Sequence, residues 1–131
     1  MKFDIPKSHH IRWQAALAVL EDIAADKRAV LDMDRYGCGN WDKPQCGTPC
    51  CFAGWIVASP YCRDLGVPSY GSGAVWWLTT NGYDKCNLWY MLFDWKLQKS
   101  TKAKTIAFLK KRLKDSFKES TGKTLTALVE Y

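Results

Sequence analysis

The 131-residue sequence lacks several features that define whole classes of protein. Only nine glycines and five prolines are present and no period repeats along the chain, which excludes collagen-like and solenoid architectures. The longest apolar run near the amino terminus, residues 15–20, is too short to span a bilayer and ends in two acids. No apolar segment follows a basic start, as it would in a secretory signal. We therefore expect a cytoplasmic protein without a membrane partner.

Signatures of common enzyme classes are also missing. The Gly-Ser-Gly at 71–73 lacks the Lys-Ser/Thr and the preceding strand of a phosphate loop. Neither Gly-x-Ser-x-Gly nor His-Glu-x-x-His occurs, and the only histidines are His9 and His10. These absences favour a binding protein over an enzyme, with neither a cofactor nor a small-molecule substrate expected.

What remains has the composition of one globular domain. Hydrophobic residues make up 47% and charged residues 24%, and seven tryptophans raise the aromatic fraction to 14%. A chain of this length buries enough surface for one core but not for two. We therefore expect a single domain over residues 1–131. Among the tryptophans, we expect Trp41 and Trp95 to be the exposed aromatic anchors, because both fall in predicted loops.

Apolar periodicity and capping residues predict a mainly α fold of five or six helices. The predicted caps are Ser8, Thr48, Ser59, Asp84, and either Ser100 or Thr101. The predicted helices are 9–27, 49–58, 60–66, 74–78, 85–93 and about 100–119. Residues 26–45 are predicted as a loop, 74–78 as a helix with a strand or short β-hairpin as the alternative, and 121–131 as a tail that docks back or adds a strand.

Positive charge is concentrated in one segment. Residues 96–123 hold ten Lys or Arg and only Asp115 and Glu119 as acids, a net charge of +8, whereas the rest of the chain sums to −2. In the last predicted helix, Ile106, Leu109 and Leu113 fall on one apolar stripe, opposite a basic face that also carries a phenylalanine. Such a face suits an acidic protein, a nucleic acid or an anionic surface, and the alternative is a solvated lysine face. The predicted partner-binding residues are Lys104, Phe108, Lys110, Lys111, Arg112, Lys114 and Lys118.

Six cysteines leave three interpretations open. They are Cys38, Cys46, Cys50, Cys51, Cys62 and Cys86. In a reducing cytosol we favour free, mostly buried thiols over metal ligands or disulfides. A structural contact of Cys46 with Cys51 or with Cys38 is compatible with this interpretation.

A cysteine in the first turn of a helix has a lowered pKa, which is how many nucleophilic thiols are made. A thiol enzyme built on Cys46, Cys50 or Cys51 would need His9 or His10 as its base. Papain-like enzymes instead place their histidine far downstream of the cysteine, where this chain has none.

Zinc is the other minority interpretation. The spacing Cys38-x7-Cys46-x3-Cys50-Cys51-x10-Cys62 matches no standard zinc knuckle and no deaminase motif. An irregular zinc site would draw on Cys38, Cys46, Cys51 or His9.

Three landmarks occur in order along the chain: Leu-Asp-Met-Asp-Arg-Tyr at 31–36, Cys46-Gly-Thr-x-x-Cys51-x-Ala-Gly-Trp55, and Leu-Phe-x-Trp at 92–95. The pattern resembles a family of small uncharacterised bacteriophage and prophage proteins marked by Cys-Gly-Thr-x-x-Cys-x-Ala-Gly-Trp. The resemblance implies a phage-encoded accessory protein in the host cytoplasm and brings no catalytic residues. Within it, Cys46, Cys51 and Trp55 form a cysteine box that would act as a structural clasp if the two cysteines pair.

Together these observations predict a phage accessory protein that engages an acidic partner, most simply a host protein that it inhibits during takeover or counter-defence. The alternatives are a nucleic-acid-binding protein that uses the basic helix, a small cysteine- or zinc-dependent enzyme, and a virion or assembly component.

Overall fold

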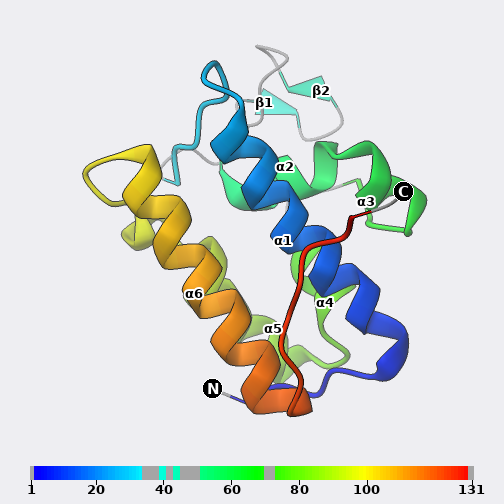
Figure 1. The fold of residues 1–131 in the computed structure, drawn as a ribbon. Coiled ribbons are helices and arrows are strands. Elements are labelled where there is room, and N and C mark those ends of the chain that lie inside the picture. Colours follow the sequence, from blue (N-terminus) through cyan, green and yellow to red (C-terminus); the bar gives the residue numbers. More distant parts are fainter. Residues whose placement is uncertain (1, 34–38, 41–42, 45–50, 70–72, 130–131) are drawn as a thin grey trace.

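The computed structural model describes residues 2–33, 39–40, 43–44, 51–69 and 73–129 (Figure 1). Within them the α-helices are α1 (His10–Ala25), α2 (Phe52–Ala58), α3 (Pro60–Asp64), α4 (Gly73–Leu78), α5 (Gly82–Leu88) and α6 (Lys102–Thr121). The predicted mainly α fold is confirmed. A two-residue antiparallel pair, β1 (Gly39–Asn40) and β2 (Lys43–Pro44), lies in the segment predicted as a loop. The segment 74–78, where a strand was the alternative, is helical.

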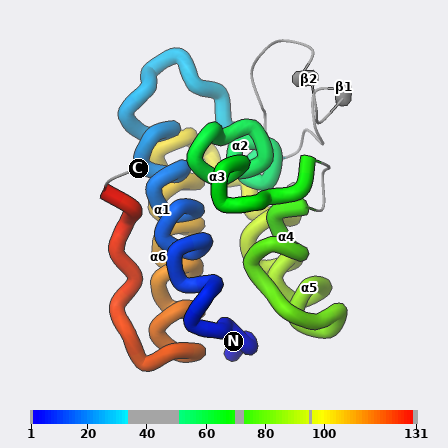
Figure 2. Tube along the Cα trace, turned by 90° about the vertical axis from the view of Figure 1, so that its right-hand side faces the viewer, coloured from blue at the N-terminus to red at the C-terminus, as the bar shows by residue number. Residues whose placement is uncertain are grey.

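α1 is the central helix and is buried on most of its circumference. Trp13, Leu17 and Leu20, which share one apolar face at helical spacing, are at most 1% exposed, whereas Ala24 at the end of the same face is exposed. Ala15 and Val19, outside that face, are buried as well. The reason is that α6, α2, α3 and α4 all contact α1, while the C-terminal segment runs along it (Figure 2).

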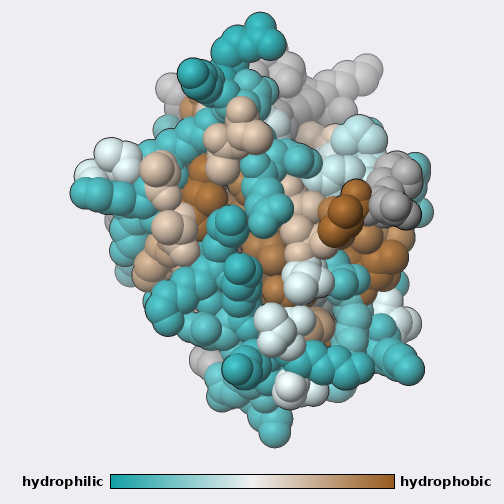
Figure 3. Space-filling view, viewed as in Figure 1, coloured by the Kyte–Doolittle hydropathy of each residue, from teal (hydrophilic) through white to brown (hydrophobic). Residues whose placement is uncertain are grey.

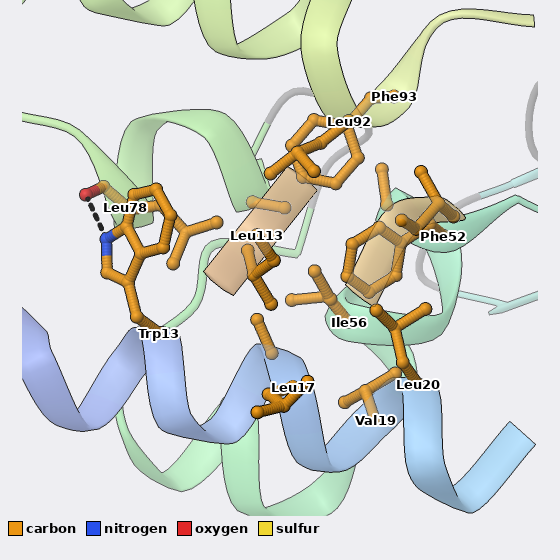
Figure 4. Close-up of a cluster of buried hydrophobic side chains, with 14 of the residues drawn as sticks. Trp13, Leu17, Val19, Leu20, Phe52, Ile56, Leu78, Leu92, Phe93 and Leu113 are labelled. Atoms are coloured by element: carbon orange, nitrogen blue, oxygen red, sulfur yellow. Dashed lines mark hydrogen bonds between the residues drawn. The ribbon is translucent and has the colours of Figure 1, made fainter. Parts of the chain in front are cut away.

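The core is built where α1 meets the shorter helices and α6 (Figure 4). Trp13 donates from Nε1 to the carbonyl of Leu78 at 3.1 Å, which gives its buried indole N–H a partner and fixes α4 against α1. Phe52 of α2 lies against Phe93, with ring centroids 5.4 Å apart. Each large apolar side chain buried in this way stabilises the fold by about 1.5–3 kcal/mol.

α6 has the amphipathic form that its sequence predicts. Ile106, Leu109 and Leu113 are at most 4% exposed and face the core. Thr101, rather than Ser100, caps the helix by accepting a hydrogen bond from the Lys104 N–H at 3.1 Å. The helix ends at Thr121, slightly later than predicted, because Gly122 adopts the left-handed conformation with φ of 75°. Over the described ranges, no helix combines the length and apolarity needed to cross a membrane.

The predicted boundary between α2 and α3 is confirmed, whereas α2 begins later in the chain than predicted. Ser59 ends α2 and Pro60 opens α3, as expected of a proline at the first helical position. α2 itself begins at Phe52, because Cys51 has an extended backbone and serves as the N-cap residue. The predicted start at Thr48 and Pro49 lies outside the described residues.

The start of α5 differs from the prediction. Asn81 caps α5 by accepting from the Asp84 N–H at 2.9 Å, so Asp84 is a first-turn residue and not the cap. The Asp84 carboxylate is buried and accepts from the Asn81 side-chain amide and from the Asp4 N–H. The two residues therefore satisfy the helix start reciprocally and hold the N-terminal segment in place.

The helix predicted over 85–93 continues beyond α5 as a π-helical turn, Trp89–Phe93. Leu88 and Leu92 are fully buried there, as the periodicity predicts. A 3₁₀ turn, Trp95–Leu97, then leads toward α6.

Two predictions at the chain ends have different outcomes. Ser8 does not cap α1: it lies within a 3₁₀ turn, Lys7–His9, and α1 follows without a side-chain cap. Pro6 fixes the turn that leads into α1, because its carbonyl accepts from the His9 N–H at 2.8 Å.

The C-terminal tail docks back as predicted: Leu125 is 2% exposed, and the Leu128 N–H donates to the Gln14 carbonyl of α1.

We expect Asn81→Ala to lower the free energy of unfolding by about 1 kcal/mol, because it removes the cap acceptor and one donor to Asp84. Asn81→Ser, which keeps a cap acceptor, should recover most of the loss. Urea denaturation followed by circular dichroism measures both. Equal stability of the alanine variant and the parent would show that the cap contributes nothing.

Candidate functional site

An open groove of about 780 Å³ lies between the end of α1 and α6. Its floor is formed by Ala24, Ala103, Ile106 and Ala107. Its rim is formed by Lys27, Lys102, Lys110, Lys111, Lys114 and Asp115. Figure 3 shows tan and brown apolar surface over this part of α1 and α6, bordered by teal hydrophilic side chains. The groove therefore combines an apolar base with a strongly cationic edge.

The groove exists because two helices of unequal length pack side by side in opposite directions (Figures 1 and 2). α1 ends at Ala25, so its last turn lies next to the first turns of α6. There Ala24 on α1 and Ala103 and Ala107 on α6 present only methyl groups. Two helix surfaces that carry side chains this short leave a hollow between them.

Three rim lysines have partners within the protein. Lys102 donates to the Asp26 carbonyl at 2.7 Å, and so joins α6 to the end of α1. Lys110 lies 3.6 Å from the Glu21 carboxylate, and Lys111 pairs with Asp115 one turn along α6 at 2.9 Å. Ion pairs this exposed contribute little to stability, so an incoming carboxylate can replace them at small cost.

The other two rim lysines are available for a ligand. Lys27 and Lys114 are exposed, and no ion pair within the described residues holds either of them. They lie on different elements, Lys27 just beyond α1 and Lys114 on α6. A ligand in the groove therefore meets one lysine without an ion pair from α6 and another from the segment that follows α1.

The sequence-predicted residues of α6 separate into two groups in the structure. Lys110, Lys111 and Lys114 line the groove. Lys104 and Lys118 are exposed on the same helix but are not part of its lining. Sequence reasoning missed Lys27, Lys102 and the alanine floor, because these residues form a groove only through the packing of α1 beside α6.

Phe108 and Arg112 do not lie on the exposed lysine face, where the sequence placed them. Phe108 is half-buried and packs against the core. The Lys99 ammonium is 4.1 Å and the Arg112 guanidinium 4.6 Å from the centroid of its ring. Arg112 also donates to the Met91 carbonyl at 3.2 Å. Arg112 thus joins α6 to the π-helical turn, and Phe108 packs against the core beneath it.

A second exposed cluster lies on α4, α5 and the π-helical turn. Trp76, Tyr83 and Tyr90 are 43%, 79% and 66% exposed, and the Lys85 ammonium lies 4.2 Å from the Trp76 ring centroid. Helix phase could have revealed part of this cluster, since Tyr83 and Tyr90 are two turns apart and opposite the buried Leu92. The predicted anchors, Trp41 and the side chain of Trp95, lie outside the described part of the chain.

The cysteine box is described only in part. Cys51 is buried at the N-cap of α2, and Trp55 donates from Nε1 to the Val30 carbonyl at 2.8 Å. Cys38, Cys46 and Cys50 lie outside the described residues, so the clasp and the zinc site stay predictions. Within the described ranges, no three His, Cys, Asp or Glu side chains converge as a metal site would require.

The two histidines lie at the start of α1, at the opposite end of that helix from α2 (Figures 1 and 2). His9 contacts the Leu78 carbonyl at 3.4 Å, and burial together with the nearby Arg12 charge lowers the pKa of its ring. His10 packs edge-on against Phe117, with centroids 5.1 Å apart. Neither histidine is therefore brought to Cys51, the one box cysteine that the structure describes.

We expect iodoacetamide at about pH 8 to modify Cys86 in the native protein and to leave Cys62 unmodified. Cys86 is exposed, whereas Cys62 is fully buried and burial raises the pKa of its thiol to about 12. Because the thiolate is the reactive form, both access and ionisation protect Cys62. Peptide mass spectrometry measures each site, with urea-unfolded protein as the control. Comparable labelling of both cysteines in the native protein would refute this.

Comparison of the chain with protein-family models, with curated proteins and with solved structures finds no match in any of the three. No relative therefore supplies a ligand or a residue role. What the groove binds is inferred from its own residues and from their charges.

Proposed function

We propose that this chain is a binding protein, not an enzyme, and that the groove between α1 and α6 captures an acidic segment of a partner protein. One observation carries the proposal: five lysines surround a floor made of three alanines and Ile106. Carboxylates of a partner satisfy the lysines, and its apolar side chains cover the floor. Both kinds of contact are needed to fill the groove. A purely ionic ligand would leave the apolar floor uncovered, and a purely apolar ligand would leave the lysines without partners.

The groove suits a protein better than a nucleic acid. A phosphate backbone is bound by cations that follow it, and exposed aromatic rings commonly stack on unpaired bases. Here Asp115 and Glu21 interrupt the row of lysines and the floor is apolar, so the groove offers no continuous line of cations for a phosphate backbone to follow. Phe108, the aromatic residue that the sequence offers for stacking, is half-buried beneath two cations of its own chain. These contacts disfavour nucleic acid as the ligand.

The biological setting of the proposal comes from the resemblance to the phage family. A phage accessory protein that uses its own basic groove to bind another protein would act on a host component in the cytoplasm. The proposed effect is inhibition of that host protein, in takeover of the cell or in defeat of a defence system.

The double variant Lys27→Glu/Lys114→Glu should abolish capture of the partner. It reverses the two rim lysines that have no ion pair within the described residues, and so it repels an acidic ligand with little disturbance of the fold. Tagged protein incubated with bacterial host lysate, with and without nuclease, is read out by mass spectrometry. The matched control is Lys7→Glu/Lys123→Glu, which makes the same change in net charge at exposed positions outside the groove.

Three outcomes would overturn the proposal. Enrichment that disappears with nuclease and falls steeply with salt would assign the basic surface to nucleic acid. Capture that survives in the groove variant but is lost in Tyr83→Ala/Tyr90→Ala would move the interface to the aromatic cluster. Self-association at micromolar concentration, with no host protein retained, would favour an assembly component.

A further inference from the structure

We infer that the segment bound in the groove is an acidic amphipathic α-helix, which packs as a third helix against the pair α1 and α6. This inference rests on the proposed function and specifies the form of the acidic segment. It follows from the length of the groove, the chemistry of its floor and the spacing of its lysines.

The groove has the length of a short helix. Its lining on α6 extends from Lys102 to Asp115. At 1.5 Å per residue these thirteen steps span about 20 Å, which matches a helix of about fourteen residues. The groove is open along the surface and not an enclosed cavity, so a helix can enter it from the side.

The floor allows a helix to approach closely. Ala103 and Ala107 are one turn apart on α6, and Ala24 faces them from α1. The distance between packed helices is set by the side chains at their contact, and alanine makes that distance short. Ile106, which is 4% exposed, supplies the larger apolar contact at the base.

The lysines of the groove are spaced to meet the acidic side chains of a docked helix. Lys110 and Lys114 are one turn apart on α6, the spacing at which two glutamates stand on one edge of a docked helix. Lys27 lies just beyond the end of α1 and contributes a third cation to the same groove from outside α6. The methylene stems of these lysines extend the apolar floor while their ammonium groups stay in water.

An extended peptide is disfavoured by its own backbone. Binding as a strand requires an edge with unpaired main-chain N–H and C=O groups. The walls of this groove are the helices α1 and α6, and only the last turn of α1 and the first turn of α6, at one end of the groove, have main-chain groups without a partner in the same helix. An extended segment would leave its N–H and C=O groups facing alanine and isoleucine, whereas a helix satisfies them internally.

The experiment uses the full chain and three fluorescent probes. The first is a peptide of about fourteen residues that, as a helix, places an alanine and leucine stripe between two rows of glutamate. The second has the same composition in an order that destroys the stripe, and the third is a twelve-nucleotide single-stranded DNA. Fluorescence anisotropy gives the affinities, and circular dichroism reports the helicity of the bound peptide.

We expect the amphipathic peptide to bind at least about tenfold more tightly than the scrambled one, and to gain helicity on binding. Ala107→Trp, which fills the floor at an exposed position, should weaken binding of the amphipathic peptide by about tenfold or more. Thr124→Trp, at an exposed position outside the groove, should leave it unchanged.

The failure of this inference is distinguishable from failure of the proposed function. Equal binding of both peptides, with no effect of Ala107→Trp, would overturn the helix and leave an acidic protein partner in place. Host-protein capture in the lysate experiment without binding of either peptide would do the same. Binding of the DNA but of neither peptide would overturn both.

Discussion

The packing of α1 against α6 is the contact on which the rest of the structure depends. α1 is buried by neighbours on most of its circumference, and α6 supplies the largest share of that cover along the whole of α1. Leu113 and Leu109 of α6 meet the same core as Leu17 and Leu20 of α1. The shorter helices are held against this pair, α4 through the bond from Trp13 to the Leu78 carbonyl. At the groove, the contact between α1 and α6 is made mainly by alanines, whose side chains are too short to fill the space between the two helices.

The groove concentrates positive charge that the fold compensates only in part. Glu21 and Asp115 each neutralise one lysine, and the Asp26 carbonyl orients a third. All of these contacts are at the surface, where water screens the repulsion between the lysines. The site therefore costs the fold little, and it retains net positive charge for a ligand. This electrostatic arrangement suits the acidic partner proposed for the groove, because such pairs contribute more to selectivity than to stability.

Several local features were beyond sequence reasoning because tertiary contacts decide between equivalent signals. Asn81-Gly82 reads equally well as a helix stop or a helix start, and the Asp84 carboxylate, held also by the Asp4 N–H, selects the start. Ser8 has the chemistry of a cap, but the 3₁₀ turn after Pro6 places it within a turn. Phe108 belongs by helix phase to the lysine face, yet the ring is drawn inward against the core and covered by Lys99 and Arg112.

The sequence by itself determined the helical class, the apolar stripe of α6, the proline that opens α3 and the basic character of the last helix, because periodicity and local charge are properties of neighbouring residues. It also predicted Lys110, Lys111 and Lys114 as partner-binding residues, and these three lysines line the groove. Only the tertiary structure decided that these lysines line one groove together with Lys27 and an alanine floor, since that relation joins residues far apart in the chain. A one-dimensional pattern records which side of a helix is charged. It does not record which other helix lies beside it, and that neighbour turns a charged helix face into a groove.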